Sequence, residues 1–384
     1  MKQRTYKATG INLKGMPMGE SDRLVTVLTK EHGLVRAIAP GARKHKSRLG
    51  GRSGLFVVND ALFTRGKSID KLIQAETLKS FPGLSKDLAK LTASQYLAEI
   101  VLAQALTEQP QEELYYLFIE HLSRLEAASR SSVLPCLAQA TFHFLALAGL
   151  APELFRCCLS RVPLTVELGN PEWKVGFSVS SGGAVATEEI ERLECDRLKE
   201  IEQRIAERDA HRQIQRQAHS AAPLVTEPAS RYQTGTDDQP QKKRPVGLKD
   251  QVAKDVAKEI GVVTYLNGAE LALMQQLSKP ELVMTAAPQT LSSAGAQMRP
   301  KSGTIKQTAA NKSDVQASVR QMSGSANAPA NAPANSPANA PANSYFASGP
   351  HVMWKHVEQA LRQYAQYQFD RPIKSATLID TCFS

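Results

Sequence analysis

Residues 23–39 of this 384-residue chain read RLVTVLTKEHGLVRAIA, and their hydrophobic pattern decides the fold of the N-terminal part. Residues that strands favour recur at every second position, namely Leu24, Thr26 and Leu28, and then Leu34 and Ile38 on either side of Arg36. A period of two is typical of β-strands, and His32-Gly33 lies between the two runs as a turn. The stretch therefore predicts two strands separated by a turn.

The same alternation extends over residues 5–81. Glycine-containing turns interrupt it at residues 10, 15–19, 32–33, 40–41, 50–51 and 65–66. About five short strands result, and a small barrel such as the oligonucleotide-binding (OB) fold is common at this size. We therefore predict an α+β protein with a five-stranded OB-fold barrel over residues 1–81, followed by an α-helical domain that low-complexity inserts interrupt.

The net charge of the chain lies entirely in this N-terminal part. The first eighty residues hold 16 Lys and Arg against 6 Asp and Glu, which equals the net charge of +10 of the whole chain. The densest run is residues 41–52, GARKHKSRLGGR, with five fixed cations and no acid. A basic loop on a small β-barrel favours contact with a nucleic acid, although a solvated loop that binds nothing is the alternative.

We expect phosphate contacts from the cations of the barrel, because long basic side chains each reach one phosphate and release its counterions. The candidate DNA-binding residues are Arg23, Arg36, Arg43, Lys44, Lys46, Arg48, Arg52, Arg65 and Lys67. Aromatic residues are few, and Phe56, Phe63 and Phe81 fit core positions, which leaves Tyr6. Binding led by the phosphate backbone, with little base stacking, is therefore expected.

The hydrophobic period changes to that of helices after Pro82. Ser85 is the predicted N-cap of a first helix that ends at Pro110, a second helix begins at Glu112, and a third runs from about Val133 to Ala148 before Gly149. Two more helices are predicted at residues 268–277 and 352–369. Trp354, Tyr364, Tyr367 and Phe369 of the last helix are expected to pack in the core, although a groove with basic rims formed by Lys355, Arg362 and Arg371 would suit an acidic peptide.

Two inserts divide the helical domain. The predicted layout is the barrel at 1–81, helical segments at 82–186, 262–283 and 350–384, a charged and polar insert at 187–261, and a linker at 284–349. We expect one exposed helix in the first insert and disorder in the rest of it. The second insert contains prolines at 329, 333, 337 and 341 among Ala and Asn, which is typical of a linker.

No motif for catalysis or metal binding stands out. The chain lacks a phosphate-binding G-x-x-x-x-G-K-[ST] loop, a G-x-S-x-G nucleophile motif and an H-E-x-x-H zinc motif, so we expect no enzyme activity. Five cysteines without repeated pair spacing predict free thiols, and the residue three after Cys157 is Ser160, so no zinc or other cofactor is expected. Without a signal-peptide pattern or an apolar span long enough for a membrane, we expect a cytoplasmic protein, associated with the nucleoid.

The chain resembles a known family. Residues 6–13, GESDR at 19–23, TKEHGLVR at 29–36, and GAR with KSRLGG at 41–51 are similar to the N-terminal domain of the bacterial DNA repair protein RecO. Later segments follow that family in order: residues 150–154, 177–183, 268–277 and 364–375. The resemblance covers about residues 1–185, 262–282 and 350–376, and the run from Gly19 to Gly51 is highly specific.

The resemblance implies an OB-fold barrel joined to a helical domain, and a recombination mediator without enzyme activity. It implies binding to single-stranded and double-stranded DNA, annealing of complementary strands, and RecA loading together with RecR. It also implies that the helical domain docks the acidic C-terminal tail of single-strand-binding protein. Many family members have a zinc site of two C-x-x-C pairs, but here only Cys157 matches a ligand, and Ser160, Ala186 and Glu189 stand at the other positions.

Two other functions remain open from the residues alone. The first is an RNA-binding barrel that acts in translation or ribosome assembly, which would prefer structured RNA over single-stranded DNA. The second is an interaction scaffold whose helical domain and inserts recruit proteins. Loss of function on deleting the helices, but not on neutralising the basic loop, would favour the scaffold.

Overall fold

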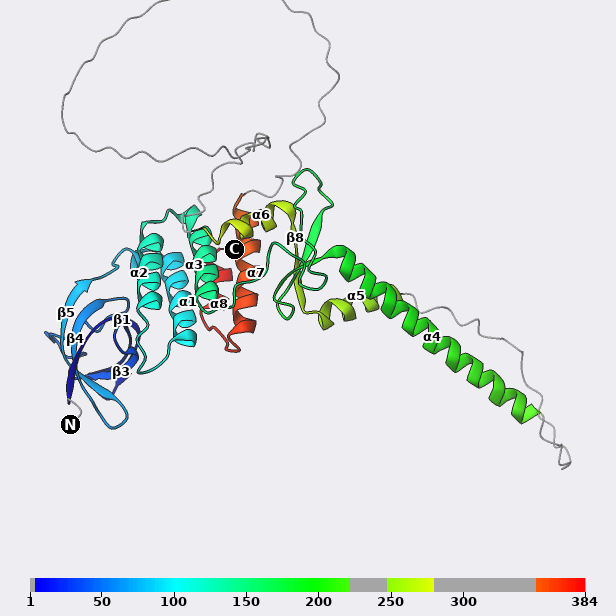
Figure 1. The fold of residues 1–384 in the computed structure, drawn as a ribbon. Coiled ribbons are helices and arrows are strands. Elements are labelled where there is room, and N and C mark those ends of the chain that lie inside the picture. The colour runs from blue at the N-terminus through cyan, green and yellow to red at the C-terminus, as the bar shows by residue number, and fades with distance from the viewer. Residues whose placement is uncertain (1–3, 221–246, 280–349, 384) are drawn as a thin grey trace, which may run out of the picture. The chain divides into compact units, whose positions relative to one another are not determined.

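The N-terminal part is a closed five-stranded barrel. The computed structural model describes residues 4–220, 247–279 and 350–383. The strands are β1 (Thr5–Met18), β2 (Asp22–Thr29), β3 (Gly33–Ala39), β4 (Val58–Thr64) and β5 (Asp70–Lys79), in the order β1-β2-β3-β5-β4 (Figure 1). The long β1 pairs with β2 and also closes the barrel onto β4, while β3 and β5 run parallel. The predicted five-stranded barrel is confirmed.

Alternation along β2 and β3 separates an inner from an outer face. Val25, Val27, Val35 and Ala37 are buried in the barrel, whereas Leu24, Thr26 and Ile38 are partly exposed on its outside. Arg36, which lies between Val35 and Ala37, is therefore on the outer face and exposed. The outer face of β2 and β3 combines a basic side chain with partly exposed apolar and hydroxyl side chains.

Helices follow the barrel, but the first ends at Gln104 rather than Pro110, and a helix that was not predicted lies at Ala376–Cys382. They are α1 (Leu88–Gln104), α2 (Glu112–Ala127), α3 (Val133–Leu147), α6 (Gly268–Gln276), α7 (Pro350–Gln368) and α8 (Ala376–Cys382), with short 3-10 turns at Leu84–Lys86 and Arg130–Ser132. The predicted cap at Ser85 is wrong. The Asp87 carboxylate accepts hydrogen bonds from the amides of Ala89 and Lys90, because Leu84–Lys86 forms a separate turn before α1 begins.

The sequence patterns missed a small sheet in the helical part. Strands β6 (Lys174–Ser178), β7 (Gly183–Ala186) and β8 (Val262–Asn267) form an antiparallel sheet in the order β7-β6-β8. The strands are short, and β8 comes from beyond the first insert, so no local pattern could pair it with β6. His356 of α7 holds this sheet, since its ring nitrogens hydrogen-bond Thr264 Oγ1 at 2.6 Å and Glu270 Oε1 at 2.7 Å.

The first insert contains more helix than predicted. The expected exposed helix is present as α4 (Thr187–Ser220), but a second helix, α5 (Leu248–Glu259), packs against it through Val252 and Val256, where the prediction was disorder. The linker predicted at 284–349 and the polar residues 221–246 lie outside the described residues.

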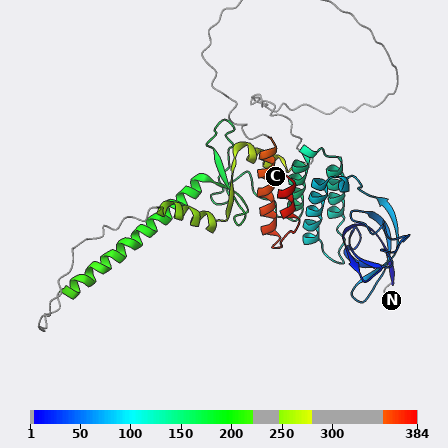
Figure 2. The same ribbon diagram turned by 180° about the vertical axis from the view of Figure 1, so that it is seen from behind.

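Seen from both sides, α7 runs beside α3 (Figures 1 and 2). Among the helices that the structure describes, none is long and apolar enough to span a bilayer.

Barrel and helices share one hydrophobic core. Ile11, Leu28 and Phe56 of the barrel belong to the same buried cluster as the residues of α1, α2 and α3, and the rings of Phe56 and Phe118 lie 6.1 Å apart. The turn between β2 and β3 docks on the loop before α2. The amide of Leu34 donates to Leu106 O at 2.8 Å, and the amide of Gln111 donates to Lys30 O at 3.1 Å.

We predict that Gly33→Ala destabilises this junction. Gly33 has φ +61°, and a Cβ there would lie 2.3 Å from the carbonyl oxygens of both Leu106 and Gln109, so the turn and the loop would have to separate. The free energy of unfolding should fall by about 2–4 kcal/mol in urea denaturation. Gly169→Ala, where no heavy atom lies within 4 Å, is the control and should change it by less than about 1 kcal/mol. Equal effects would contradict the close approach.

The helical core contains a pair of histidines, of which His121 is buried and His143 is partly exposed. His121 Nε2 lies 3.1 Å from His143 Nδ1, and His143 Nε2 donates to Leu277 O at 2.9 Å. His143 thus has hydrogen-bond partners, as expected from its place on an apolar helix. Burial, followed by the neighbouring His143 and Arg124, lowers the pKa of His121 to about 3. The neutral form of His121 is therefore the form that the folded chain holds.

We predict that His121 makes the fold acid-sensitive. Its pKa is lower in the folded than in the unfolded chain, so the unfolded chain binds more protons, and the free energy of unfolding falls as the pH drops below about 6.5. Between pH 7 and pH 5 the wild type should lose about 2 kcal/mol more than His121→Gln. Urea denaturation at both pH values measures this difference. Parallel pH profiles for the two proteins would show that His121 does not cause the effect.

Candidate nucleic-acid interface

Strand register gathers cations on the outer face of the barrel. Lys14 of β1 lies opposite Thr26 of β2, and Thr26 lies opposite Arg36 of β3. One row further along, Ile38 of β3 lies beside Lys71 of β5. Lys14, Arg36 and Lys71 are all exposed. The motif-based prediction missed Lys14 and Lys71, because only the pairing between strands shows that they share a face with Arg36.

The basic loop begins against the turn between β1 and β2. The amide of Arg43 donates to Ser21 O at 2.8 Å, its Nη1 donates to Gly19 O at 3.0 Å, and the amide of Gly41 donates to Asp22 Oδ1 at 2.7 Å. The pKa of Asp22 is lowered mainly by the hydrogen bond from the Gly41 amide, and the charges of Lys44 and Lys71 lower it further. The start of the loop, the β1–β2 turn and Lys71 therefore lie at one end of the outer face.

Side chains of the barrel hold the far part of the basic loop in place. Asn12 Nδ2 donates to the carbonyls of Arg52 and Gly54 at 2.8 Å each, and Asn59 Nδ2 donates to Arg52 O at 2.9 Å. Ala42 and Leu49 of the loop are buried with the barrel core. The loop is thus an ordered element of the barrel, and its cations project from a fixed backbone.

The predicted site residues differ in their exposure and in their partners. Arg43, Lys44, Lys46 and Arg48 are exposed on the loop, Arg36 is exposed on β3, and Lys67 is exposed in the β4–β5 connection, while Arg52 is partly buried. Arg65 lies over the Tyr6 ring at 4.8 Å and 4.0 Å from Glu108 Oε1. Arg23 is engaged with the loop, since its Nη1 donates to Gly50 O, Ser53 O and Ser53 Oγ at 2.9–3.3 Å.

Comparison with known proteins gives the family of the chain. The family model described as Recombination protein O N terminal matches residues 1–81, and the one described as Recombination protein O C terminal matches residues 85–199. The DNA repair protein RecO of a Nostoc species is 43% identical over 99% of this chain and 97% of its own length. The chain belongs to the RecO family. The RecO of Nostoc punctiforme is 42% identical over the same shares, and that of Gloeothece citriformis is 64% identical over 47% of this chain and 65% of its own length.

Membership of the RecO family assigns the chain a role in DNA repair and recombination. It also identifies the N-terminal barrel as an OB fold. The outer face of β2 and β3, together with the connections that border it, is where OB folds contact oligonucleotides. The cations described above lie on that face and on the loop beside it.

The residues at the zinc positions of other RecO proteins do not fit a metal here. Cys157 is buried, and its Sγ accepts a hydrogen bond from the Ala186 amide at 3.3 Å. Burial acts to raise the pKa of this thiol, but hydrogen bonds from Ser160 and Ala186 outweigh it and lower the pKa. Glu189 pairs with Arg192 on α4. Within the described residues, no three His, Cys, Asp or Glu side chains are grouped as metal ligands.

Three of the four aromatic residues predicted at the C-terminal helix pack against the core of this RecO protein. Trp354 and Tyr364 are buried, and Phe369 is partly buried against the same cluster. Arg362, which the groove hypothesis placed on a basic rim, is also buried, and its guanidinium pairs with Glu358 and Asp380. The prediction of core packing is confirmed for Trp354 and Tyr364, but it is wrong for Tyr367, which is exposed because it lies on the outer side of α7. Arg362 is not on a rim.

We predict that Arg23 stabilises the basic loop. In Arg23→Ala the carbonyls of Gly50 and Ser53 lose a charged donor, so the free energy of unfolding should fall by about 1–3 kcal/mol. Hydrogen exchange of the Ser53 and Gly54 amides should accelerate, because both donate to carbonyls within the loop. Lys44→Ala, at an exposed position, is the control and should stay within about 0.5 kcal/mol. Unchanged exchange in Arg23→Ala would disprove this role.

Proposed function

We propose that this RecO protein binds single-stranded and double-stranded DNA through the phosphates, on the outer face of its barrel and the adjoining basic loop. The observation that carries this proposal is a run of exposed cations on an ordered loop without acids. The Arg43 amide fixes the start of the loop on Ser21 O, and Asn12, Arg23 and Asn59 fix its end at Arg52 and Ser53. Because the backbone is already ordered, binding costs little additional loop entropy.

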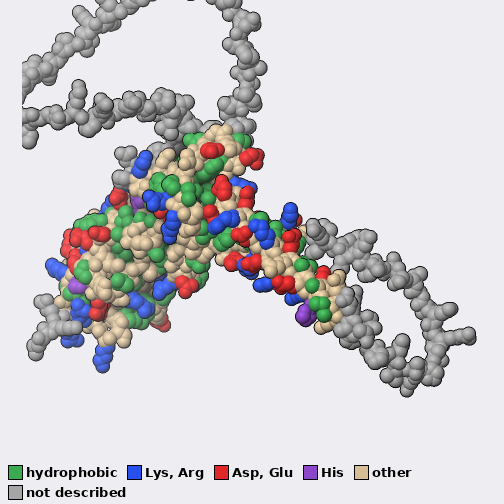
Figure 3. All heavy atoms as spheres, turned by 45° about the vertical axis from the view of Figure 1, so that its right-hand side comes forward, with side chains coloured by type: hydrophobic (Ala, Val, Ile, Leu, Met, Phe, Trp, Pro, Cys, Tyr) green, Lys and Arg blue, Asp and Glu red, His purple; other side chains and the backbone are tan. Residues whose placement is uncertain are grey.

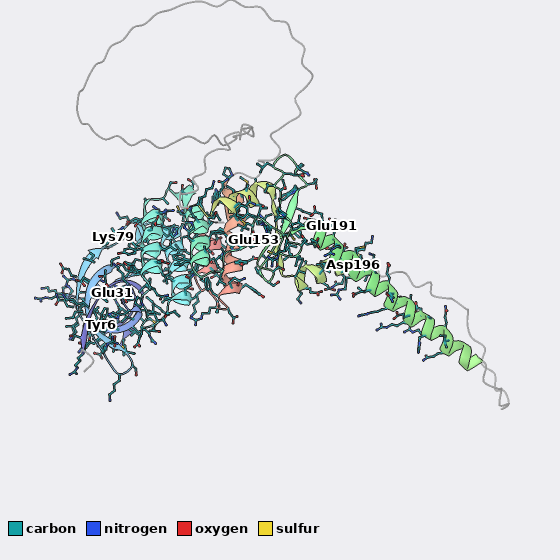
Figure 4. All side chains as sticks on the ribbon, viewed as in Figure 1. Tyr6, Glu31, Lys79, Glu153, Glu191 and Asp196 are labelled. Carbon is teal, nitrogen blue, oxygen red and sulfur yellow. The ribbon has the colours of Figure 1, made fainter. Side chains whose placement is uncertain are left out.

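Phosphate contacts, rather than base stacking, dominate the proposed binding. Phe56, Phe63 and Phe81 are buried. Tyr6 stacks on Phe63 with ring centroids 5.4 Å apart, has the edge of His32 against it at 4.7 Å, and carries Arg65 over its ring. Figure 4 labels Tyr6 on the barrel. With its ring already packed between neighbours, Tyr6 has little surface left for a base, so binding should depend little on DNA sequence.

The proposed role is that of a recombination mediator. Neutralising the phosphates of one strand lowers the repulsion that its complement meets, which would promote annealing of strands coated with single-strand-binding protein. We further propose that the protein acts at the nucleoid and assists RecA loading together with RecR. The proposal requires no catalytic step, in agreement with the role of the RecO family as a mediator.

A hollow on the helical part is the proposed site for the acidic tail of single-strand-binding protein. It has a volume of about 840 Å³ and lies where β5 meets α2 and α3. Ile119, Ala127 and Cys136 line it, together with Lys79 and with Arg124, which pairs with Glu120 in the same lining. An apolar lining with cations suits a peptide that carries both carboxylates and apolar side chains. Figure 4 labels Lys79 near the junction of barrel and helices.

We predict that neutralising the loop weakens DNA binding and its salt dependence. If each of the five cations of residues 41–52 meets one phosphate of a single strand, log affinity should fall with log salt at a slope of about −3.5. The triple variant Lys44→Gln, Lys46→Gln, Arg48→Gln should bring this slope to about −1.4. Fluorescence anisotropy of a labelled oligonucleotide over a salt series measures both affinity and slope, and strand annealing is followed in the same buffers.

The control carries the same loss of charge elsewhere. The variant Arg192→Gln, Lys199→Gln, Lys254→Gln removes three exposed cations from the first insert and should keep the wild-type slope. Equal DNA affinity and annealing in the loop variant and the control would refute the proposal. Tighter binding of structured RNA than of single-stranded DNA at equal salt would instead favour the RNA-binding alternative.

A further inference from the structure

Helix α4 extends well beyond the helix that packs against it. It has 34 residues, which correspond to about 51 Å at 1.5 Å per residue, whereas α5 has 12. The end of α5 is fixed to the inner part of α4 by the ion pair between Glu259 and Arg197. Counting back from Glu259, α5 begins beside about Arg208, so the outer part of α4 stands without a helical neighbour (Figure 1).

The charge of α4 changes sign along its length. Residues 187–203 hold seven acids and three bases, and this inner part has ion pairs one turn apart: Glu189 with Arg192, Asp196 with Lys199 and Glu200 with Arg197. Glu191 and Asp196 are labelled on this part in Figure 4. Residues 204–220 hold four arginines and two acids. An exposed helix that only needs solubility would continue the mixed pattern.

Three arginines form a stripe that begins beside α5 and continues onto the outer part. Arg204, Arg208 and Arg212 are spaced by four residues, lie within about 80° of the helix circumference, and are all exposed. Glu207 and Asp209 fall outside this sector, on either side of it. The sequence continues the spacing at Arg216. Figure 3 shows charged side chains along the surface of α4.

Helix stability explains this arrangement only in part. Glu207 and Asp209 lie three residues from Arg204 and Arg212, respectively, but the arginines themselves are spaced by four. Like charges four residues apart repel and destabilise an exposed helix, whereas pairs of opposite charge, such as those of the inner part, stabilise it. Guanidinium groups in a row along an open helix are instead complementary to a row of phosphates. The stripe therefore fits an anionic polymer better than solvent.

Two other occupants fit the outer part less well. A coiled coil with a second copy would need apolar residues at heptad positions, but the register that includes Ile205 places Arg208 and Arg212 in its seam. A membrane surface would need a broad apolar face, whereas Ile205 and Ile214 are the large apolar residues between 204 and 215. A nucleic-acid backbone is the partner that matches the charges.

We propose that the outer half of α4 is a second DNA-contact surface, which holds one strand by its phosphates while the barrel holds another. The inference rests on the proposed DNA binding of the barrel. From Arg204 to Arg212 the stripe is about 12 Å long, which corresponds to three or four nucleotides at 3.4 Å per nucleotide. Annealing needs two strands on one protein, and a second surface away from the barrel supplies the second attachment.

The test uses the full-length protein and a matched pair of variants. The stripe variant is Arg204→Gln, Arg208→Gln, Arg212→Gln, in which helix propensity is nearly unchanged, and the control is again Arg192→Gln, Lys199→Gln, Lys254→Gln. Each protein is saturated with a first oligonucleotide, and a second, non-complementary labelled strand is titrated in. The wild type and the control should bind the second strand with a salt slope of about −2, and the stripe variant should bind it about tenfold more weakly.

The outcomes separate this inference from the proposal for the barrel. If the wild type fails to bind the first strand, the proposed function falls. If all three proteins bind the first strand and the stripe variant also binds the second strand like the control, the second surface is disproved while the barrel proposal stands. If the stripe variant loses only binding to vesicles of phosphatidylglycerol, a membrane contact replaces the DNA contact. Circular dichroism verifies equal helix content in the variants.

Discussion

The turn from Lys30 to Gly33 packs closely against the loop before α2. The hydrophobic core that barrel and helices share depends on this close contact. Gly33 is the residue that permits it, because a side chain there would meet two carbonyl oxygens. Lys30 strengthens the junction, since its Nζ donates to Tyr116 Oη at 2.6 Å and lies 3.4 Å from Glu112 Oε1. Behind this turn, Leu28 and Phe56 enter the same cluster as Phe118. Barrel and helices are therefore stabilised by the same buried surface.

The shared core also orders the candidate DNA-binding loop. Phe56 closes the loop, its amide donates to Asn12 O at 2.9 Å, and its ring lies beside Phe118 of α2. Five cations without an acid would repel one another in a free loop. Here the burial of Phe56, Ala42 and Leu49, together with the hydrogen bonds from Asn12, Asn59 and Arg23, offsets that repulsion. These buried side chains and hydrogen bonds fix the loop on the barrel, so its cations are left exposed to solvent.

The region of the missing zinc ligands is stabilised in a different way. The Cys157 thiol receives hydrogen bonds where a metal would need three further ligands, and the backbone around it pairs with β7. The Cys158 amide donates to Ala184 O at 2.8 Å, and the Ala184 amide donates to Glu153 O at 2.8 Å. Gly183, with φ +150°, lets this backbone come close, since a Cβ there would lie 2.1 Å from Glu153 O. Backbone pairing and a small residue thus maintain the loop without a cluster of ligands.

Local period, turn residues and composition are enough to predict the barrel, most helices and the basic loop. Arg43, Lys44, Lys46 and Arg48 could be found from one run of residues. Tertiary structure alone decided that Arg23 serves the loop, that Lys14 and Lys71 join Arg36 on one face, and that β8 completes a sheet begun at Lys174. These relations arise between segments distant in the chain, and register, burial and close approach do not appear in any local pattern.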